Sequence, residues 1–170
     1  MSSGIAKNGG KPVFNVYSTF LQRTYDQLVQ DLCVNNNSAV IINHMASVYG
    51  MNDVTHLGFF DIPMLTNIPN LVYLAPTNNE ELLAMTEYAV HQHEHPVAIR
   101  VPVGEFTSTG VADTTDYSIL NKSEVTRRGE RIALLGLGNF YHLANQVADA
   151  LAKDGINATC ILYTSPSPRD

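Results

Sequence analysis

The stretch Val13–Leu32, VFNVYSTFLQRTYDQLVQDL, decides how this chain folds. Its first five residues are rich in β-forming side chains and a helical pattern follows at once, which predicts a strand that runs directly into a helix. Thr19 and Gln22 have the spacing of a capping box, so the helix is expected to start at Thr19. The side chains expected to face the core from this helix are Leu21, Tyr25, Leu28 and Leu32.

Three side chains of the same stretch lie near the carboxyl end of the predicted strand: Tyr17, Phe20 and Arg23. Open α/β sheets bind their ligands at the carboxyl ends of the strands. An aromatic ring and a guanidinium at that place can stack on a flat heterocycle and donate hydrogen bonds to it. The pattern also fits an ordinary strand-to-helix turn with Phe20 in the core, and on the pattern alone this plainer interpretation is favoured.

Further strands and helices alternate along the chain. The apolar runs at 39–43, 71–75 and 97–101 are typical of buried parallel strands. Because helices are expected between them, the fold class predicted for residues 1–103 is α/β, with a doubly wound, mostly parallel sheet. Residues 44–60 between two of these elements form a long loop, which in a compact domain is usually functional.

Several helix boundaries can be placed from local signals. Gly9-Gly10 is typical of the end of a helix, so residues 2–8 are expected to be a last helical turn. Asp61-Ile62-Pro63 predicts a cap followed by a short helix ending near Asn67. Thr77 and Glu80 form a second predicted capping box, which opens a helix through about His91.

The remainder of the chain is expected to be an incomplete second α/β unit. Residues 104–130 have no strong period and predict a linker or a small hairpin. A strand at 131–137, a helix at 139–153 and a strand at 157–163 follow, with Leu143, Val147 and Leu151 on one face of the helix. One β-α-β unit cannot cover both faces of its sheet. The Pro-rich end, 164–170, does not continue the pattern and is expected not to be native coding sequence.

Composition excludes several classes of function. The 170 residues are 45% hydrophobic and 15% charged, with a formal net charge of -6 and no long run of Lys or Arg. Nucleic acid is therefore not an expected partner. No apolar run reaches membrane-spanning length and no signal peptide is recognised, so a cytoplasmic location is expected. The alternating histidines at 91, 93 and 95 do not share a helix face, and no metal site is expected there.

The block YSTFLQRTYDQ, together with THLGFFD, IPNLVYLAP and HPVAIRVPVG, resembles the central pyrimidine-binding domain of 1-deoxy-D-xylulose-5-phosphate synthases. These enzymes belong to the transketolase group, which depends on thiamine diphosphate and Mg²⁺. The resemblance covers residues 2 to about 162. It implies a transferase that decarboxylates pyruvate and passes the two-carbon unit to an aldehyde, in a homodimer.

The resemblance also implies roles for individual residues. The aromatic ring of the Ser-Thr-Phe triplet packs on the aminopyrimidine of the cofactor in this family, which points to Phe20 and reverses the plainer interpretation. Tyr17 and Arg23 match residues that line the same pocket. His56 matches a histidine that faces the reacting carbon and the substrate hydroxyls, and an imidazole can exchange a proton there near neutral pH.

The chain departs from the family pattern at the expected acceptor site. Met45 and Val103 stand where the family has arginines that are expected to hold the acceptor phosphate, and Asn52 stands in place of an Asp. Each lost hydrogen bond to a charged group contributes roughly 1.5–3 kcal/mol. Together they predict a binding loss of about 10²–10⁴-fold for a phosphorylated aldehyde. His44 is a weaker substitute, so an acceptor other than glyceraldehyde 3-phosphate is expected.

The catalytic Glu and the domain that holds the diphosphate and Mg²⁺ precede this region in the family. The chain is accordingly expected to be a fragment that is inactive alone. Two alternatives stay open. One is a transketolase or 2-keto-acid dehydrogenase-type subunit that pairs with a separately encoded chain. The other is a non-catalytic module that keeps the fold for binding or dimerisation.

Overall fold

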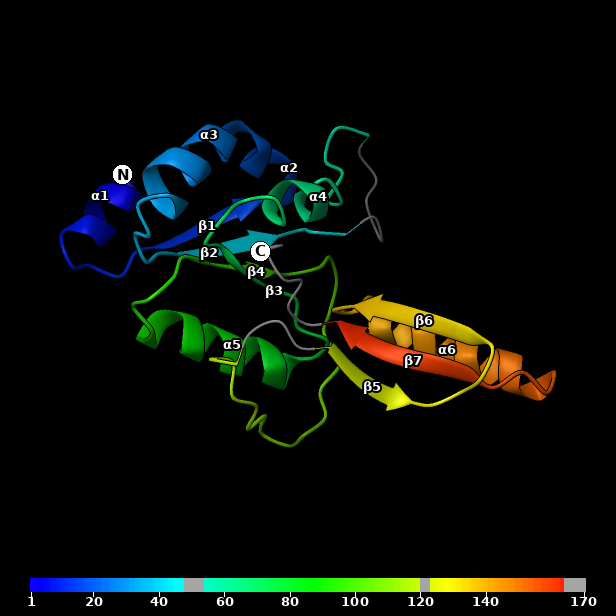
Figure 1. The fold of residues 1–170 in the computed structure, drawn as a ribbon. Helices are drawn as coiled ribbons and strands as arrows, with labels where there is room; N and C mark the ends of the chain where they lie inside the picture. Colours follow the sequence, from blue (N-terminus) through cyan, green and yellow to red (C-terminus); the bar gives the residue numbers. More distant parts are fainter. Residues whose placement is uncertain (48–53, 120–122, 164–170) are drawn as a thin grey trace.

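The computed structural model describes residues 1–47, 54–119 and 123–163, and Figure 1 shows their arrangement. The helices and strands follow in the order α1 Ser2–Lys7, β1 Val13–Tyr17, α2 Ser18–Leu21, η1 Gln22–Thr24, α3 Tyr25–Gln27, η2 Leu28–Cys33, β2 Val40–His44, α4 Asp61–Leu65, β3 Val72–Leu74, α5 Asn79–His91, β4 Val97–Arg100, β5 Ser123–Arg127, β6 Ile132–Leu137, α6 Phe140–Lys153 and β7 Ala158–Tyr163. Here η1 is a 3₁₀ turn and η2 a π-helical turn.

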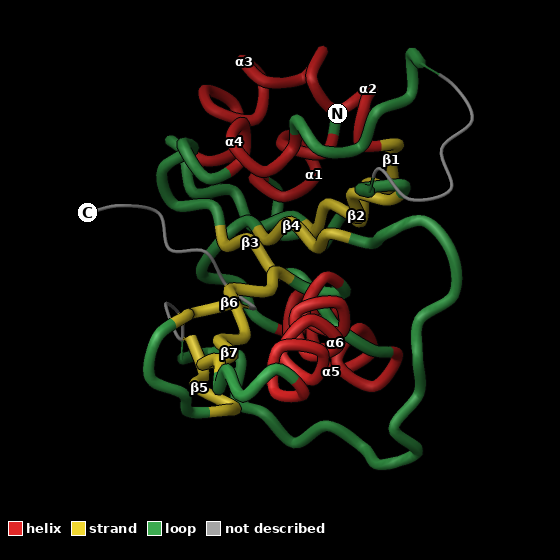
Figure 2. Tube along the Cα trace, turned by 90° about the vertical axis from the view of Figure 1, so that its right-hand side faces the viewer, coloured by secondary structure: helices red, strands yellow, loops and turns green. Residues whose placement is uncertain are grey.

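The first sheet is parallel throughout and has the strand order β1-β2-β4-β3. The chain passes from β2 to the far edge before β4 returns to the centre, so the connection changes direction within the sheet. Helices α1 to α4 lie on one side of this sheet and α5 lies on the other (Figure 2). This arrangement confirms the predicted doubly wound, mostly parallel α/β fold.

Alternate strand residues build two separate apolar layers, because successive side chains of a strand point to opposite faces. Ile41, Tyr73 and Ala98 pack against the helices of the first side. The opposite layer packs against α5 and includes Val72, Val97 and Ile99. Both faces of the sheet are therefore covered at its inner strands, and β4 is buried along its whole length, whereas the edge strand β1 is mostly exposed.

The segment after β1 differs from the prediction in its start and its regularity. The helix begins at Ser18 with Tyr17 as the cap residue, and no side chain caps it, so the capping box predicted at Thr19 is wrong. The Thr19 hydroxyl instead donates to the carbonyl of Thr55 at 3.1 Å. Leu21, Leu28 and Leu32 are buried as predicted. Tyr25 is 41% exposed, because the change from 3₁₀ to π-helical geometry turns it away from the core.

The observed ends of helices α1 and α5 can be compared with the predicted helix boundaries. Helix α1 ends as predicted, with Gly9 at φ +84° and the Gly10 amide bonded to the Ile5 carbonyl. Helix α5 runs to His91 as predicted, but its cap is Asn78, whose side chain accepts from the Glu81 amide at 2.8 Å. The predicted capping box at Thr77 and Glu80 is therefore wrong by one residue, and the Glu81 carboxylate accepts from the Thr77 amide at 2.8 Å.

Helix α4 starts at Asp61 rather than after it, and it ends at Leu65, two residues before the predicted end. No side chain caps this helix. The Asp61 carboxylate points into the protein interior, where it has partners other than the helix amides. The predicted cap at Asp61 is therefore wrong.

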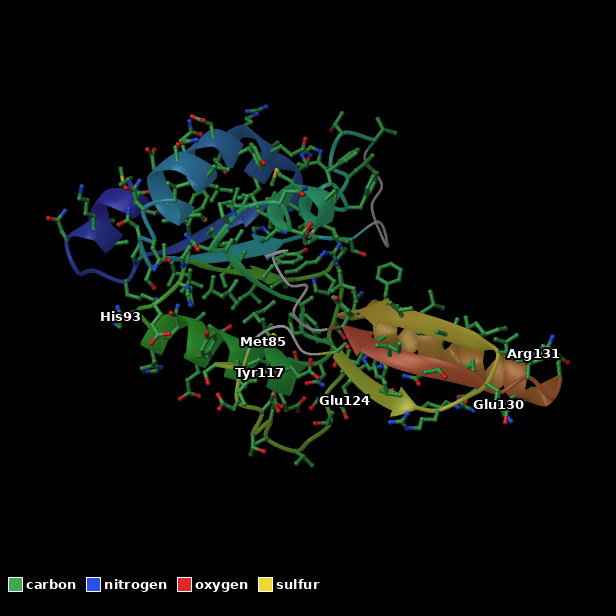
Figure 3. The ribbon with its side chains drawn as sticks, viewed as in Figure 1. Met85, His93, Tyr117, Glu124, Glu130 and Arg131 are labelled. Atoms are coloured by element: carbon green, nitrogen blue, oxygen red, sulfur yellow. The ribbon has the colours of Figure 1, made fainter. Side chains whose placement is uncertain are left out.

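The second sheet has the order β5-β7-β6, with β5 antiparallel to β7 and β6 parallel to it. Helix α6 covers one face of this sheet (Figure 1). The strand β5 lies within the stretch predicted as a linker or hairpin. Another part of that stretch packs on the first unit, where Tyr117 is buried in the layer that contains Met85 of α5 (Figure 3). The predicted tail, 164–170, lies outside the described residues.

The two units meet at the carboxyl end of β3. The ring Nε2 of His142 in α6 donates to the Thr77 carbonyl at 2.9 Å. Gly138 has a φ of +53° and approaches Ala75 and Pro76 so closely that an added Cβ would lie 3.2 Å from each. The residues just before α6 therefore contact the residues that follow β3 directly. No helix in the described part of the chain is both long enough and apolar enough to cross a membrane.

Candidate functional site

The candidate site begins where β1 and β2 end. Tyr17 is the last residue of β1, His44 is the last residue of β2, and the two are register partners. Their rings lie 4.4 Å apart between centroids and are tilted by 55°. Since parallel strands end at the same edge of their sheet, β1 and β2 bring these two rings together at the edge where α/β sheets bind ligands.

Phe20 joins this pair from helix α2. Its ring centroid lies 6.0 Å from that of Tyr17 in an edge-on arrangement. The ring is 39% exposed, whereas the next residue, Leu21, is fully buried. The plainer interpretation of the pattern, with Phe20 in the core, is therefore wrong, because Leu21 takes the core position.

His56 and Arg23 complete the cluster. The His56 ring lies 5.2 Å from Phe20 and 6.4 Å from Tyr17, edge-on to both. The guanidinium carbon of Arg23 lies 5.7 Å from the centroid of the Phe20 ring, within the range of a cation–π contact. The rings of Tyr17, Phe20, His44 and His56 are called the aromatic cluster below.

Hydrogen bonds orient the two imidazoles of the aromatic cluster. Nδ1 of His44 lies 2.5 Å from the side-chain oxygen of Asn15, and since an amide oxygen only accepts, this nitrogen carries the proton. Nδ1 of His56 lies 2.8 Å from the hydroxyl of Thr55. The structure thus brings together Tyr17, Phe20, Arg23, His44 and His56. Asn52, the remaining predicted residue, lies outside the described residues.

A buried polar cluster that the sequence patterns do not reveal lies on the same sheet. One carboxylate oxygen of Asp61 accepts from Asn43 at 2.8 Å, from the Tyr73 hydroxyl at 2.8 Å and from Nε of Arg100 at 3.0 Å. All four side chains are at most 4% exposed. Nη2 of Arg100 also donates to the carbonyl of Gly58, two residues after His56, at 3.0 Å.

The environment of Tyr73 keeps its hydroxyl a donor in this cluster. Burial and the negative charge of Asp61 raise the pKa of Tyr73 well above its ordinary value. One signal could have revealed the cluster: an arginine in the middle of the apolar run VAIRV requires a buried partner for its charge. The partner is Asp61, whose place at the start of a short helix also fits a cap.

Comparisons with known proteins show the family to which the chain is related. Residues 1–108 match the family model described as "Transketolase, pyrimidine binding domain". The chain is 38% identical to the 1-deoxy-D-xylulose-5-phosphate synthase of Natranaerobius thermophilus and 42% identical to that of Stenotrophomonas maltophilia. The alignments cover 99% and 100% of this chain but 27% and 26% of those proteins. The chain therefore spans about a quarter of the length of these relatives.

Solved structures show the same fold. A split-gene transketolase, described as an inactive β4 tetramer, superposes with a TM-score of 0.78 at 20% identity, over 96% of this chain and 52% of its own. A transketolase mutant from Pichia stipitis superposes with a TM-score of 0.77 at 14% identity, over 90% of this chain and 23% of its own. Because the family model spans more than half of the sequence, the chain belongs to the family of transketolase pyrimidine-binding domains.

Proposed function

We propose that this chain supplies the pyrimidine-binding part of the cofactor site in a thiamine-diphosphate-dependent transferase similar to 1-deoxy-D-xylulose-5-phosphate synthase. The observation that carries the proposal is the aromatic cluster. Its rings come from two strand ends, a helix and a loop, and they meet at the carboxyl edge of the sheet. Phe20 and Tyr17 nevertheless stay 39% and 41% exposed, which leaves aromatic surface for a ligand.

The residues fit an aminopyrimidine in size and chemistry. This flat heterocycle stacks on aromatic faces, and its ring nitrogens and amino group form hydrogen bonds. Phe20 and Tyr17 offer the stacking surface, and Arg23 offers a donor over the Phe20 ring. In this proposal Phe20 stacks on the pyrimidine, while Tyr17 and Arg23 shape its pocket.

When bound, thiamine diphosphate supplies a nucleophilic carbon that takes up a 2-keto acid as carbon dioxide leaves. His56 stands beside the stacking ring, so we assign it to orienting the substrate and moving a proton at its oxygen atoms. Imidazole suits this role because its ordinary pKa lies close to neutral pH. His44, held against Tyr17, is assigned to the acceptor side of the site together with Asn52.

The proposal extends to the complete enzyme. We place the diphosphate and Mg²⁺ on another part of the protein, and among the described residues no group of three or more His, Cys, Asp or Glu side chains is arranged to hold a metal ion. Pyruvate is the proposed donor, and the active protein is proposed to be a cytoplasmic homodimer. These assignments rest on the family resemblance.

The acceptor is proposed to differ from glyceraldehyde 3-phosphate. Met45 follows directly on His44 at the end of β2, and Val103 follows the end of β4, so both lie near the carboxyl edge that carries the aromatic cluster. Neither side chain carries the charge that a phosphate needs. The test is an aldehyde panel, with and without phosphate, on the complete enzyme. Met45→Arg and Val103→Arg are each expected to raise kcat/KM for phosphorylated aldehydes by about 10–100-fold, and unchanged selectivity would contradict the proposal.

The cofactor assignment is tested by thiamine diphosphate binding to the complete enzyme, with Phe20→Ala compared with Phe140→Ala. The two phenylalanines are both 39% exposed, but Phe140 lies in α6, outside the aromatic cluster. Loss of one stacking ring should weaken binding by about tenfold, since aromatic contacts contribute about 0.5–1.5 kcal/mol beyond the area they bury. Equal dissociation constants for the two variants would refute the assignment.

A further inference from the structure

The short segment that carries His56 is held on both sides of the histidine. One residue before it, the Thr55 carbonyl accepts a hydrogen bond from the Thr19 hydroxyl of helix α2 at 3.1 Å. Two residues after it, the Gly58 carbonyl accepts from Nη2 of Arg100 in strand β4 at 3.0 Å. The segment is thereby fixed to two elements that also build the candidate site and the sheet under it.

Gly58 allows the segment to lie directly on the turn after β2. A Cβ at this position would lie 2.0 Å from the Met45 carbonyl oxygen, 2.6 Å from the Ser47 amide nitrogen and 2.9 Å from Cα of Ala46. All three neighbours are backbone atoms, so they have no flexible side chain that could move aside. Any residue other than glycine would lift the segment off the turn that follows His44.

Arg100 is a rigid anchor because its own side chain is held. Nε donates to the buried carboxylate of Asp61 at 3.0 Å, and the two side chains are 4% and 0% exposed. The single guanidinium therefore contacts both Gly58 and Asp61, which are three residues apart. This arrangement fixes the path of the chain from the His56 segment into helix α4.

We infer that Thr19, Gly58 and Arg100 are positioning residues that hold the His56 ring edge-on to Phe20 in the aromatic cluster. The functional meaning of this inference rests on the proposed function, but the geometry itself can be tested without it. A misplacement of a reacting group by about 1 Å can cost on the order of 10²-fold in rate. None of the three residues needs to touch the substrate for such an effect.

The test compares two isosteric substitutions, Thr19→Val and Thr24→Val, in the 170-residue chain. Both residues are half-buried and both hydroxyls donate to a backbone carbonyl, but that of Thr24 bonds within its own segment, to Leu21 at 2.7 Å. The measurement is the ¹H–¹³C NMR spectrum of the histidine rings, with the His56 signals assigned from a His56→Gln variant. Thr19→Val is expected to move the His56 signals toward random-coil positions, because the ring leaves the ring current of Phe20, and Thr24→Val is expected to leave them in place.

Arg100→Lys supplies a second arm. An ammonium keeps the charge beside Asp61, but it lacks the fork that contacts Gly58 at the same time. It should shift the His56 signals in the same direction as Thr19→Val. Arg127→Lys, in an exposed ion pair, is the matched control. If Arg100→Lys fails to fold, the comparison of Thr19→Val with Thr24→Val still tests whether the segment's contacts position the His56 ring.

Unchanged His56 signals in Thr19→Val, at a melting temperature equal to that of Thr24→Val, would overturn the inference. The proposed function is separated from it by adding thiamine to the unsubstituted chain. If Thr19→Val moves the His56 signals and thiamine does not, the positioning holds and the cofactor assignment fails. If thiamine moves them and Thr19→Val does not, the reverse conclusion follows.

Discussion

The two α/β units of this chain differ in how they use apolar surface. In the first unit helices cover both faces of the inner strands, and two exposed aromatic rings, Tyr17 and Phe20, lie together at the carboxyl edge where the candidate site lies. In the second unit exposure is spread over a strand and a helix, with Leu135 65% and Leu143 51% exposed. What distinguishes Tyr17 and Phe20 is therefore that they lie together at one edge, whereas other exposed apolar side chains, such as Leu83 at 71% and Leu135 at 65%, lie singly on helices and strands.

The largest expected difference between the units concerns their ion pairs. Asp61→Ala leaves Arg100 buried without its carboxylate and should lower the free energy of unfolding of the first unit by about 3–5 kcal/mol. Asp149→Ala breaks the pair with Arg127, whose side chains are 69% and 34% exposed, and should cost less than about 1 kcal/mol. Urea unfolding followed by circular dichroism measures both. Similar losses for the two variants would contradict the described difference in burial.

A second test compares two leucines that both lie in strands. Leu74 in β3 is 1% exposed and Leu135 in β6 is 65% exposed. Leu74→Ala removes buried contacts and leaves a cavity, so it should destabilise the chain by about 2–5 kcal/mol. Leu135→Ala should change the stability by no more than about 0.5 kcal/mol. Thermal unfolding measures both, and a large loss for Leu135→Ala would show that its side chain is covered in solution.

A single substitution can weaken the contact between the two units without changing the core of either unit. His142→Ala removes the donor to the Thr77 carbonyl, a hydrogen bond of about 0.5–1.5 kcal/mol. Hydrogen exchange in β6 should accelerate by up to about tenfold, while exchange in the buried strand β4 stays the same. The control is His93→Ala, since His93 is exposed and follows the C-terminal end of α5, away from Thr77. Equal acceleration in both sheets would mean that the two units unfold together.

The smallest expected effect is a pH effect at Glu80. The Ser108 hydroxyl and the amides of Thr109 and Gly110 donate to this carboxylate, and these bonds lower its pKa to about 2. The folded chain favours the ionised form of Glu80. The stabilisation of the folded state by these bonds is therefore complete above the ordinary pKa of 4.5, and it is lost as the pH falls toward 2. The Thr109 and Gly110 amide NMR signals should stay constant between about pH 6 and about pH 4. A titration of these amide signals with a midpoint near pH 4.5 would show that the bonds to Glu80 are absent in solution.

Much of the fold could be predicted from apolar runs. The strands β2, β3 and β4 are buried on both faces, so their runs show no alternation and are easily located. Strand β5 was not recognised, because it is an exposed edge strand with the sequence SEVTR and its pairing depends on a distant partner, β7. The cap of α5 lies one residue from its predicted place because Thr77 and Asn78 are adjacent residues that are both suited to capping. The cap predicted at Asp61 is absent because Tyr73 and Arg100 donate to its carboxylate in the interior.

The candidate site also has a part that could be predicted from the sequence and a part that could not. The resemblance singled out Phe20, Tyr17, Arg23, His44 and His56, and the structure brings their side chains together. No local pattern could show that Thr19 bonds to Thr55 or that Arg100 reaches Gly58, since these contacts join residues 36 and 42 positions apart. Only the register of the parallel strands and the path of the loop create them.

One titration tests directly whether the aromatic cluster is a pyrimidine site. Thiamine is added to the 170-residue chain while ¹H–¹³C NMR follows the rings of Phe20, Tyr17 and His56, with Phe140 as an internal reference of equal exposure. If the aromatic cluster binds the pyrimidine, the signals of the three cluster rings shift saturably, those of Phe140 do not shift, and Phe20→Ala abolishes the response. Shifts that are equal at Phe140 and Phe20, or absent from both, would contradict this assignment.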